Sequence, residues 1–165
     1  MIDYLIVGSG LAGISFAETA MQNQKSILII DNQSQSSSLI AGGLYNPVIL
    51  KRFSEVWQAE QQLEVLDTFY QKLELKLHIK VDYKIPILRK FFSVEEQNNW
   101  FNACDNPKLS MYLKPELNKY QNKSVNASYG FGEVLNTGRI DTNTIISEFK
   151  SKLLKENRLL ETSFD

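Results

Sequence analysis

The chain has 165 residues, of which 43% are hydrophobic and 22% charged, proportions typical of a folded globular protein rather than a disordered or collagen-like one. Its formal net charge of −1 and the lack of a dense lysine and arginine run argue against nucleic acid as a ligand. One cysteine, Cys104, and one histidine, His78, cannot build an internal disulfide or an ordinary four-ligand zinc site, so we expect no metal centre. Without a basic leader or a long apolar segment, we expect a cytoplasmic protein with no membrane anchor.

The first elements follow the order of a nucleotide-binding βαβ unit. Residues 3–7 form a short apolar run, typical of a strand buried on both faces of a parallel sheet. A GxGxxG motif follows at once, and apolar residues at helical spacing then predict a helix that ends near Asn23, a residue that tolerates the left-handed conformation. Residues 26–30 predict a second buried strand, which Asp31 closes. Strand, glycine turn, helix, strand and acid is the order that such a unit requires.

Each residue type of this motif has a mechanical role. Gly8 allows the tight turn out of the strand, Gly10 leaves room for a pyrophosphate, and Gly13 lets helix and strand approach closely. The positive N-terminal end of the helix stabilises phosphate charge without a lysine or arginine. Asp31, 23 positions after Gly8, can accept hydrogen bonds from ribose hydroxyls and would repel a 2′-phosphate. The pattern predicts a dinucleotide site and disfavours NADP.

The middle of the chain continues with a serine-rich polar loop over residues 32–38 and the segment A-G-G-L-Y-N-P over 41–47. Apolar residues at alternating steps of three and four then predict a long amphipathic helix that extends to the region of Leu75. Alternating residues predict a strand at roughly 79–92, which Pro86 places at a sheet edge or a bulge, because proline cannot donate to the ladder.

The last part of the chain predicts a helix and a returning strand. Asp141 is placed as an N-cap residue, and apolar side chains from Ile145 to Leu154 follow at helical spacing. Residues 159–164 have the composition of a strand.

The motif and the A-G-G-L-Y-N-P segment together resemble the D-amino-acid oxidase-like family of FAD-dependent oxidoreductases. The resemblance is strong over residues 1–50, and the segment looks like the branch that includes the flavin half of a bifunctional tRNA-wobble-uridine modifying enzyme. It implies FAD as the cofactor, and it implies that the Ser/Ala/Gly-rich segment runs along the flavin. Family members are longer, so we expect this chain to be truncated and inactive by itself.

The expected fold class is therefore α/β, a Rossmann-like FAD-binding βαβ unit with part of an α+β substrate domain. We expect the FAD unit and flavin loop over residues 1–50, the long helix over 51–78, a partial substrate domain over 79–140, and a helix and strand that return to the nucleotide-binding sheet over 141–165. The cofactor-binding residues that we predict are Gly8, Ser9, Gly10, Leu11, Ala12, Gly13, Asp31, Asn32, Ala41, Gly42, Gly43 and Leu44. No catalytic residue can be named.

The resemblance implies oxidation of an amine or amino acid by hydride transfer to the flavin, with a small-molecule substrate. Two alternatives stay open. The glycines alone fit an NAD-dependent Rossmann oxidoreductase equally well, because NAD and FAD share the ADP moiety. A non-catalytic nucleotide-binding module is favoured if the natural chain ends at Asp165. Action on a modified tRNA nucleoside is disfavoured by the lack of a basic patch.

Overall fold

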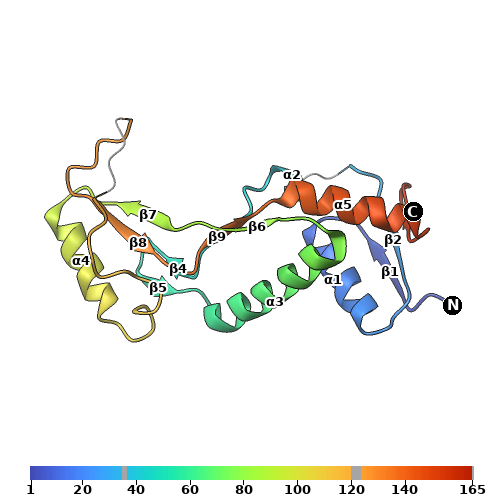
Figure 1. Cartoon of the computed structure of the whole chain (residues 1–165), viewed down its shortest axis with the longest axis horizontal. Helices are drawn as coiled ribbons and strands as arrows, with labels where there is room; N and C mark the ends of the chain where they lie inside the picture. The colour runs from blue at the N-terminus through green and yellow to red at the C-terminus, as the bar shows by residue number, and fades with distance from the viewer. Residues whose placement is uncertain (35–36, 120–123, 165) are drawn as a thin grey trace. The chain divides into compact units, whose positions relative to one another are not determined.

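The computed structural model describes residues 1–34, 37–119 and 124–164 (Figure 1). Parts of three predicted segments, the polar loop, the substrate domain and the C-terminal return, lie outside the described residues, at 35–36, 120–123 and 165 respectively. The chain divides into two compact units, each built from separated stretches of sequence. Unit 1 comprises Met1–Gly43, Glu74–Val81 and Asp141–Asp165, and unit 2 comprises Leu44–Leu73 and Asp82–Ile140.

Unit 1 contains a parallel sheet of three strands, in the order β1 (Tyr4–Val7), β2 (Ile27–Ile30) and β10 (Leu159–Leu160). Tyr4 lies opposite Ile27, and β10 adds its two residues to the other side of β2. Parallel neighbours need crossover connections, and α1 (Leu11–Gln22) provides the one from β1 to β2. Helix α5 (Thr142–Lys155) leads into β10, so the last segment of the chain returns to the sheet that the first segment begins.

The apolar run of β1 is buried on one face only, which corrects the prediction of a strand buried on both. Ile6 is 9% exposed, whereas Leu5 is 50% and Val7 62% exposed. The buried face packs with α1, whose inward side chains include Ile14, and α5 contacts α1 and β10 in the same unit. Among the described residues, no element covers the opposite face of β1, and a continuous apolar run cannot reveal which of its faces has a partner.

Two helix ends in unit 1 were predicted from the sequence, the start of α5 and the end of α1. The predicted N-cap at Asp141 is confirmed, since its Oδ1 accepts a hydrogen bond from the backbone N–H of Thr144 at 3.2 Å. Helix α1 ends at Gln22, but Asn23 has φ −90°, and the left-handed residue is Gln24 with φ 59°. The left-handed conformation that we expected at Asn23 is therefore adopted by Gln24, one residue later. Glutamine has less intrinsic preference for this conformation than asparagine.

The long helix α3 (Ala59–Leu77) starts later than the predicted segment 51–78 and continues past Leu75. Before it, β4 (Val48–Ile49) and β5 (Ser54–Glu55) form a short antiparallel hairpin. Two non-glycine residues with positive φ, Phe53 and Gln58, turn the chain before the helix begins. The periodic apolar pattern extends through these turns, which is why the pattern alone places the start too early.

The single strand predicted at 79–92 is wrong, because two strands of different sheets occupy this range. Strand β6 (Asp82–Lys84) pairs with β9 (Gly138–Ile140) at the edge of the sheet β3-β9-β6, in which β3 is Leu44–Tyr45. Strand β7 (Ile87–Lys90) pairs instead with β8 (Phe131–Val134). Pro86 lies at the break, where the buried Thr137 hydroxyl donates to the carbonyl of Ile85 at 2.6 Å and accepts from the N–H of Ile87 at 3.1 Å.

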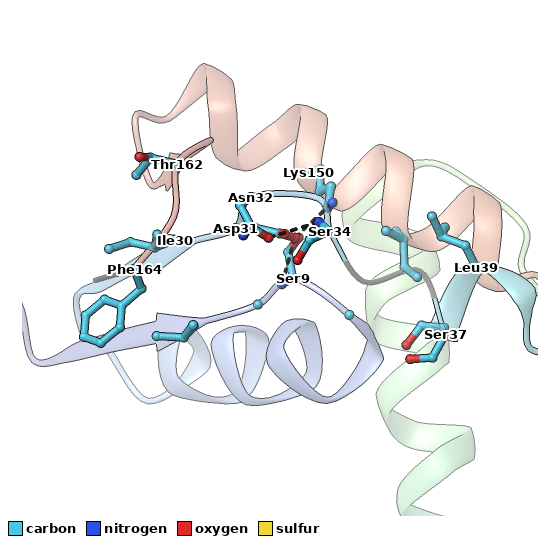
Figure 2. Close-up of a pocket in the computed structure, with 15 residues that line it drawn as sticks. Ser9, Ile30, Asp31, Asn32, Ser34, Ser37, Leu39, Lys150, Thr162 and Phe164 are labelled. Carbon is cyan, nitrogen blue, oxygen red and sulfur yellow. Dashed lines mark hydrogen bonds and ion pairs between the residues drawn. The ribbon is translucent and has the colours of Figure 1, made fainter.

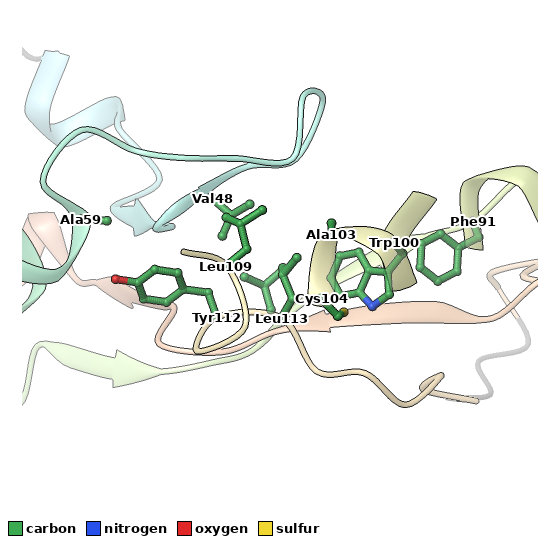
Figure 3. Packing of buried hydrophobic residues seen from close by; sticks show 10 residues of the cluster. Val48, Ala59, Phe91, Trp100, Ala103, Cys104, Leu109, Tyr112 and Leu113 are labelled. Carbon is green, nitrogen blue, oxygen red and sulfur yellow. The ribbon is translucent and has the colours of Figure 1, made fainter. Parts of the chain in front are cut away.

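Unit 2 has its own hydrophobic core, centred on α4 (Val94–Cys104) and the residues around it (Figure 3). Trp100 is fully buried, and its Nε1–H donates to the carbonyl oxygen of Lys114 at 3.0 Å. A side chain at Gly132 would overlap the indole ring, so β8 needs glycine where it crosses Trp100. Ser93 caps the start of α4, since its Oγ accepts a hydrogen bond from the N–H of Glu96 at 3.2 Å, and Glu96 Oε2 accepts one from the N–H of Phe92 at 2.9 Å.

Candidate functional site

The turn from β1 into α1 depends on glycine at two positions. Gly8 has φ +93°, a conformation that residues with a side chain rarely adopt. A Cβ atom on Gly13 would overlap the carbonyl oxygen of Gly8 and would lie 3.2 Å from its carbonyl carbon. Helix α1 therefore packs directly on the backbone that leaves β1. Gly10 is the N-cap residue of α1 and has an ordinary φ of −70°, so its lack of a side chain is not a conformational need.

A cavity of about 350 Å³ opens at this turn, at the carboxyl ends of β1 and β2. The turn forms one side of it through Gly8, Ser9 and Gly10. The short helix α2 (Ser37–Ile40) forms another side, and Ser38 Oγ accepts a hydrogen bond from the N–H of Leu11 at 3.2 Å. The other lining residues are Val7, Ile30, Asp31, Asn32, Ser34, Leu39, Ile146, Lys150, Thr162 and Phe164.

Asp31, just after β2, is the centre of a polar network in this cavity (Figure 2). Its Oδ2 accepts a hydrogen bond from the backbone N–H of Ser9 at 3.0 Å and a second, shorter one from the Ser9 hydroxyl. Its Oδ1 accepts from the N–H of Gln33 at 2.7 Å. Lys150 extends from α5 and places its Nζ 3.1 Å from Oδ2. The carboxylate is thereby fixed between the glycine turn and the last helix.

These contacts keep Asp31 ionised. Burial by itself raises the pKa of the carboxyl group, but the hydrogen bonds from Ser9 and Gln33 and the ammonium of Lys150 outweigh it and lower the pKa from 3.8 to about 2. A carboxylate that is ionised at neutral pH, beside a helix N-terminus, suits a ligand that carries both hydroxyl donors and phosphates. The ADP portion of a dinucleotide has both.

We expect replacement of Lys150 by methionine to raise the pKa of Asp31 and to lower the free energy of unfolding by about 1 kcal/mol. Methionine keeps the aliphatic length and removes only the charge. A carboxyl group whose pKa is lower in the folded state than in the unfolded chain stabilises the fold at pH values above its unfolded pKa. This stabilisation is lost as the pH falls from 3.8 to about 2. Urea unfolding at about pH 7 should show the difference, and at about pH 2 it should vanish.

Lys155→Met is the matched control, because Lys155 is an exposed lysine on the same helix and forms no ion pair with a described residue. An equal loss of stability in both variants would show that Lys150 acts through general charge on α5 and not through Asp31.

The structure brings together five of the predicted cofactor-binding residues, since Gly8, Ser9, Gly10, Asp31 and Asn32 all line the cavity. The remaining predicted residues of unit 1, which are Leu11, Ala12, Gly13, Ala41, Gly42 and Gly43, do not line it, and Leu44 belongs to unit 2.

Sequence reasoning missed the lining residues Ser34, Ser37 and Ser38, although the serine-rich composition of their loop was a signal for them. It also missed Lys150, for which no local signal exists, because only the return of α5 and β10 to the sheet brings this lysine to Asp31.

Comparisons with known proteins agree with this geometry. The sequence model of the FAD binding domain family matches residues 3–75. Among solved structures, iminodiacetate oxidase from Chelativorans sp. BNC1 is similar with a TM-score of 0.68 and 12% identity, over 96% of this chain and 46% of the oxidase. Glycine oxidase from Bacillus cereus ATCC 14579 gives a TM-score of 0.63 and 18% identity, over 98% of this chain and 46% of that enzyme.

A third structure, FAD-bound L-alpha-glycerophosphate oxidase from Mycoplasma pneumoniae, gives a TM-score of 0.60 and 16% identity, over 94% of this chain and 42% of the oxidase. The chain thus spans less than half the length of these proteins. The structural matches confirm the predicted α/β fold class, and the family match over residues 3–75 agrees with the predicted FAD-binding unit. In the described residues, no helix is long and apolar enough to cross a bilayer.

Proposed function

We propose that this chain is the FAD-binding part of an FAD-dependent oxidoreductase that acts on an amine or amino acid. The proposal is supported by the match of residues 3–75 to the FAD binding domain family and by the similarity in fold to iminodiacetate oxidase and glycine oxidase. The observation that carries the proposal is the charged Asp31 beside the glycine turn, in a cavity at the carboxyl ends of two parallel strands. Two of the similar structures are oxidases of iminodiacetate and of glycine, which are both amines.

In this proposal the chain holds the ADP side of the cofactor. The positive N-terminal end of α1 faces the pyrophosphate, and Gly10 leaves the space that the pyrophosphate needs. Asp31 accepts a hydrogen bond from a hydroxyl of the adenosine ribose, and Lys150 and Ser9 fix the direction of its carboxylate. When bound, the flavin supplies the hydride acceptor for oxidation of the carbon beside the nitrogen. The task of these residues is to bind and orient, and none of them is assigned a proton-transfer role.

The substrate class can be tested by comparing amines with glycerophosphate, because the similar structures include an oxidase of glycerophosphate as well as oxidases of amines. We expect the natural full-length protein to carry FAD, identified by its visible absorbance and by chromatography of the released cofactor. Anaerobic addition of small amines and amino acids should bleach the oxidised flavin, and L-alpha-glycerophosphate should not.

Two results would contradict the proposal. Release of NAD in place of FAD would favour the NAD-dependent alternative, and bleaching by glycerophosphate alone would refute the amine specificity while leaving the cofactor assignment intact.

A further inference from the structure

Unit 2 contains a second cavity, of about 240 Å³, which shares no lining residue with the cavity of Asp31. One face of α3 forms its acidic side. Glu60, Glu64 and Asp67 are spaced by four and three residues, so their side chains leave the helix on the same face. Leu63 and Met111 add apolar surface to the same cavity. The volume is below the range typical of drug-sized ligands, so a small ligand fits it best.

Tyr112 is the unusual residue of this cavity. Its side chain is only 1% exposed and belongs to the hydrophobic core of unit 2, yet its hydroxyl has no hydrogen-bond partner among the described residues. Figure 3 shows the hydroxyl at the end of the ring that points toward Ala59, the first residue of α3. Burial, together with the nearby carboxylates of Glu55 and Glu60, raises the pKa of this hydroxyl, so it stays neutral. A buried hydroxyl without a partner is unfavourable, and a polar atom of a ligand in this cavity would satisfy it.

The charges around the cavity leave an excess of carboxylate. Lys84 is the cation of the lining, and it is already engaged, since its Nζ lies 2.9 Å from Asp82 Oδ2 and also pairs with Asp67. Glu60 and Glu64 form no ion pair with any residue in the part of the chain that the structure describes. No group of histidine, cysteine, aspartate and glutamate among the described residues is placed to hold a metal ion. A ligand that carries positive charge would offset this excess of carboxylate.

We propose that this cavity binds a small primary alkylammonium ion. An ammonium group has three N–H donors, which match the carboxylates of Glu60 and Glu64 and the unpaired oxygen of Tyr112. The alkyl chain then contacts Leu63 and Met111. A guanidinium group is a poorer match, because its planar fork needs a coplanar pair of acceptors. This inference does not depend on the oxidase activity proposed above.

The test is calorimetric titration of the natural full-length protein with n-butylammonium chloride. We expect binding, and we expect the double variant Glu60→Gln/Glu64→Gln to weaken it about tenfold or more, since it removes both charged acceptors. Tyr112→Phe should weaken it severalfold and should not lower the melting temperature, because the hydroxyl that it removes has no partner. Glu95→Gln is the control, an exposed glutamate on α4 of the same unit.

The ligand controls are n-butanol, which lacks the charge, and tetramethylammonium, which lacks the N–H donors. Binding of butanol or tetramethylammonium as tight as that of butylammonium would overturn the proposal. So would wild-type protein that does not bind butylammonium, or affinities that are equal in wild type, Tyr112→Phe and the double variant. The visible spectrum of the flavin in the same samples reports on the cofactor separately, so a failure of one proposal is not read as a failure of the other.

Discussion

Replacement of Gly13 by alanine is expected to destabilise unit 1 strongly and to abolish FAD binding. The new methyl group would overlap the carbonyl oxygen of Gly8, and this obstacle is backbone, which cannot rotate away as a side chain can. Ile6, on the buried face of β1, lies 3.6 Å away on the same side and blocks a sideways shift. Helix α1 must therefore move off the strand, at a cost of about 3 kcal/mol. Urea unfolding of the FAD-free protein measures this loss.

Gly10→Ala is the matched variant, three residues earlier in the same motif. Its methyl group would lie 3.0 Å from Ser38 Oγ, the end of a small side chain that can rotate, and the φ of −70° suits alanine. We expect little change in stability but a loss of FAD affinity of about tenfold or more, because the methyl group occupies the space proposed for the pyrophosphate. If Gly10→Ala binds FAD normally, the pyrophosphate does not lie at this turn.

The glycine motif shows which features of the site can be predicted from local sequence. The GxGxxG motif, the strands on either side of it and Asp31 are all local signals, and the structure places Gly8, Gly10 and Asp31 around one cavity, as the spacing predicts. Local signals succeed here because a tight turn, a helix start and a strand end each depend on a few neighbouring residues.

Other features depend on contacts between distant parts of the chain and leave no local signal. Lys150 reaches Asp31 only because β10 pairs with β2, over a hundred residues away in sequence. The break at Pro86 needs the hydroxyl of Thr137 to replace ladder hydrogen bonds. Tertiary context decides each of these.

Replacement of Asp31 by asparagine is expected to lower FAD affinity about tenfold to a hundredfold. This range corresponds to the free energy of one hydrogen bond to a charged acceptor. Asparagine has nearly the same shape, but its NH2 group would meet donors, because Ser9 and Lys150 both donate to the same carboxylate oxygen. The lowered pKa of Asp31 corresponds to about 2 kcal/mol of folding free energy at neutral pH, which the variant would also lose. Fluorescence titration with FAD and urea unfolding measure the two effects.

Asp3→Asn separates binding from stability. Asp3 has the same residue type in the same unit, and its Oδ2 accepts hydrogen bonds from the N–H and hydroxyl of Ser26 at 2.8 and 2.6 Å, which lower its pKa as well. It does not line the cavity of Asp31. We therefore expect Asp3→Asn to keep the FAD affinity of the wild type even where it lowers stability. A parallel loss of FAD affinity in both variants would mean that Asp31 acts on the fold alone, and that the ribose has another acceptor.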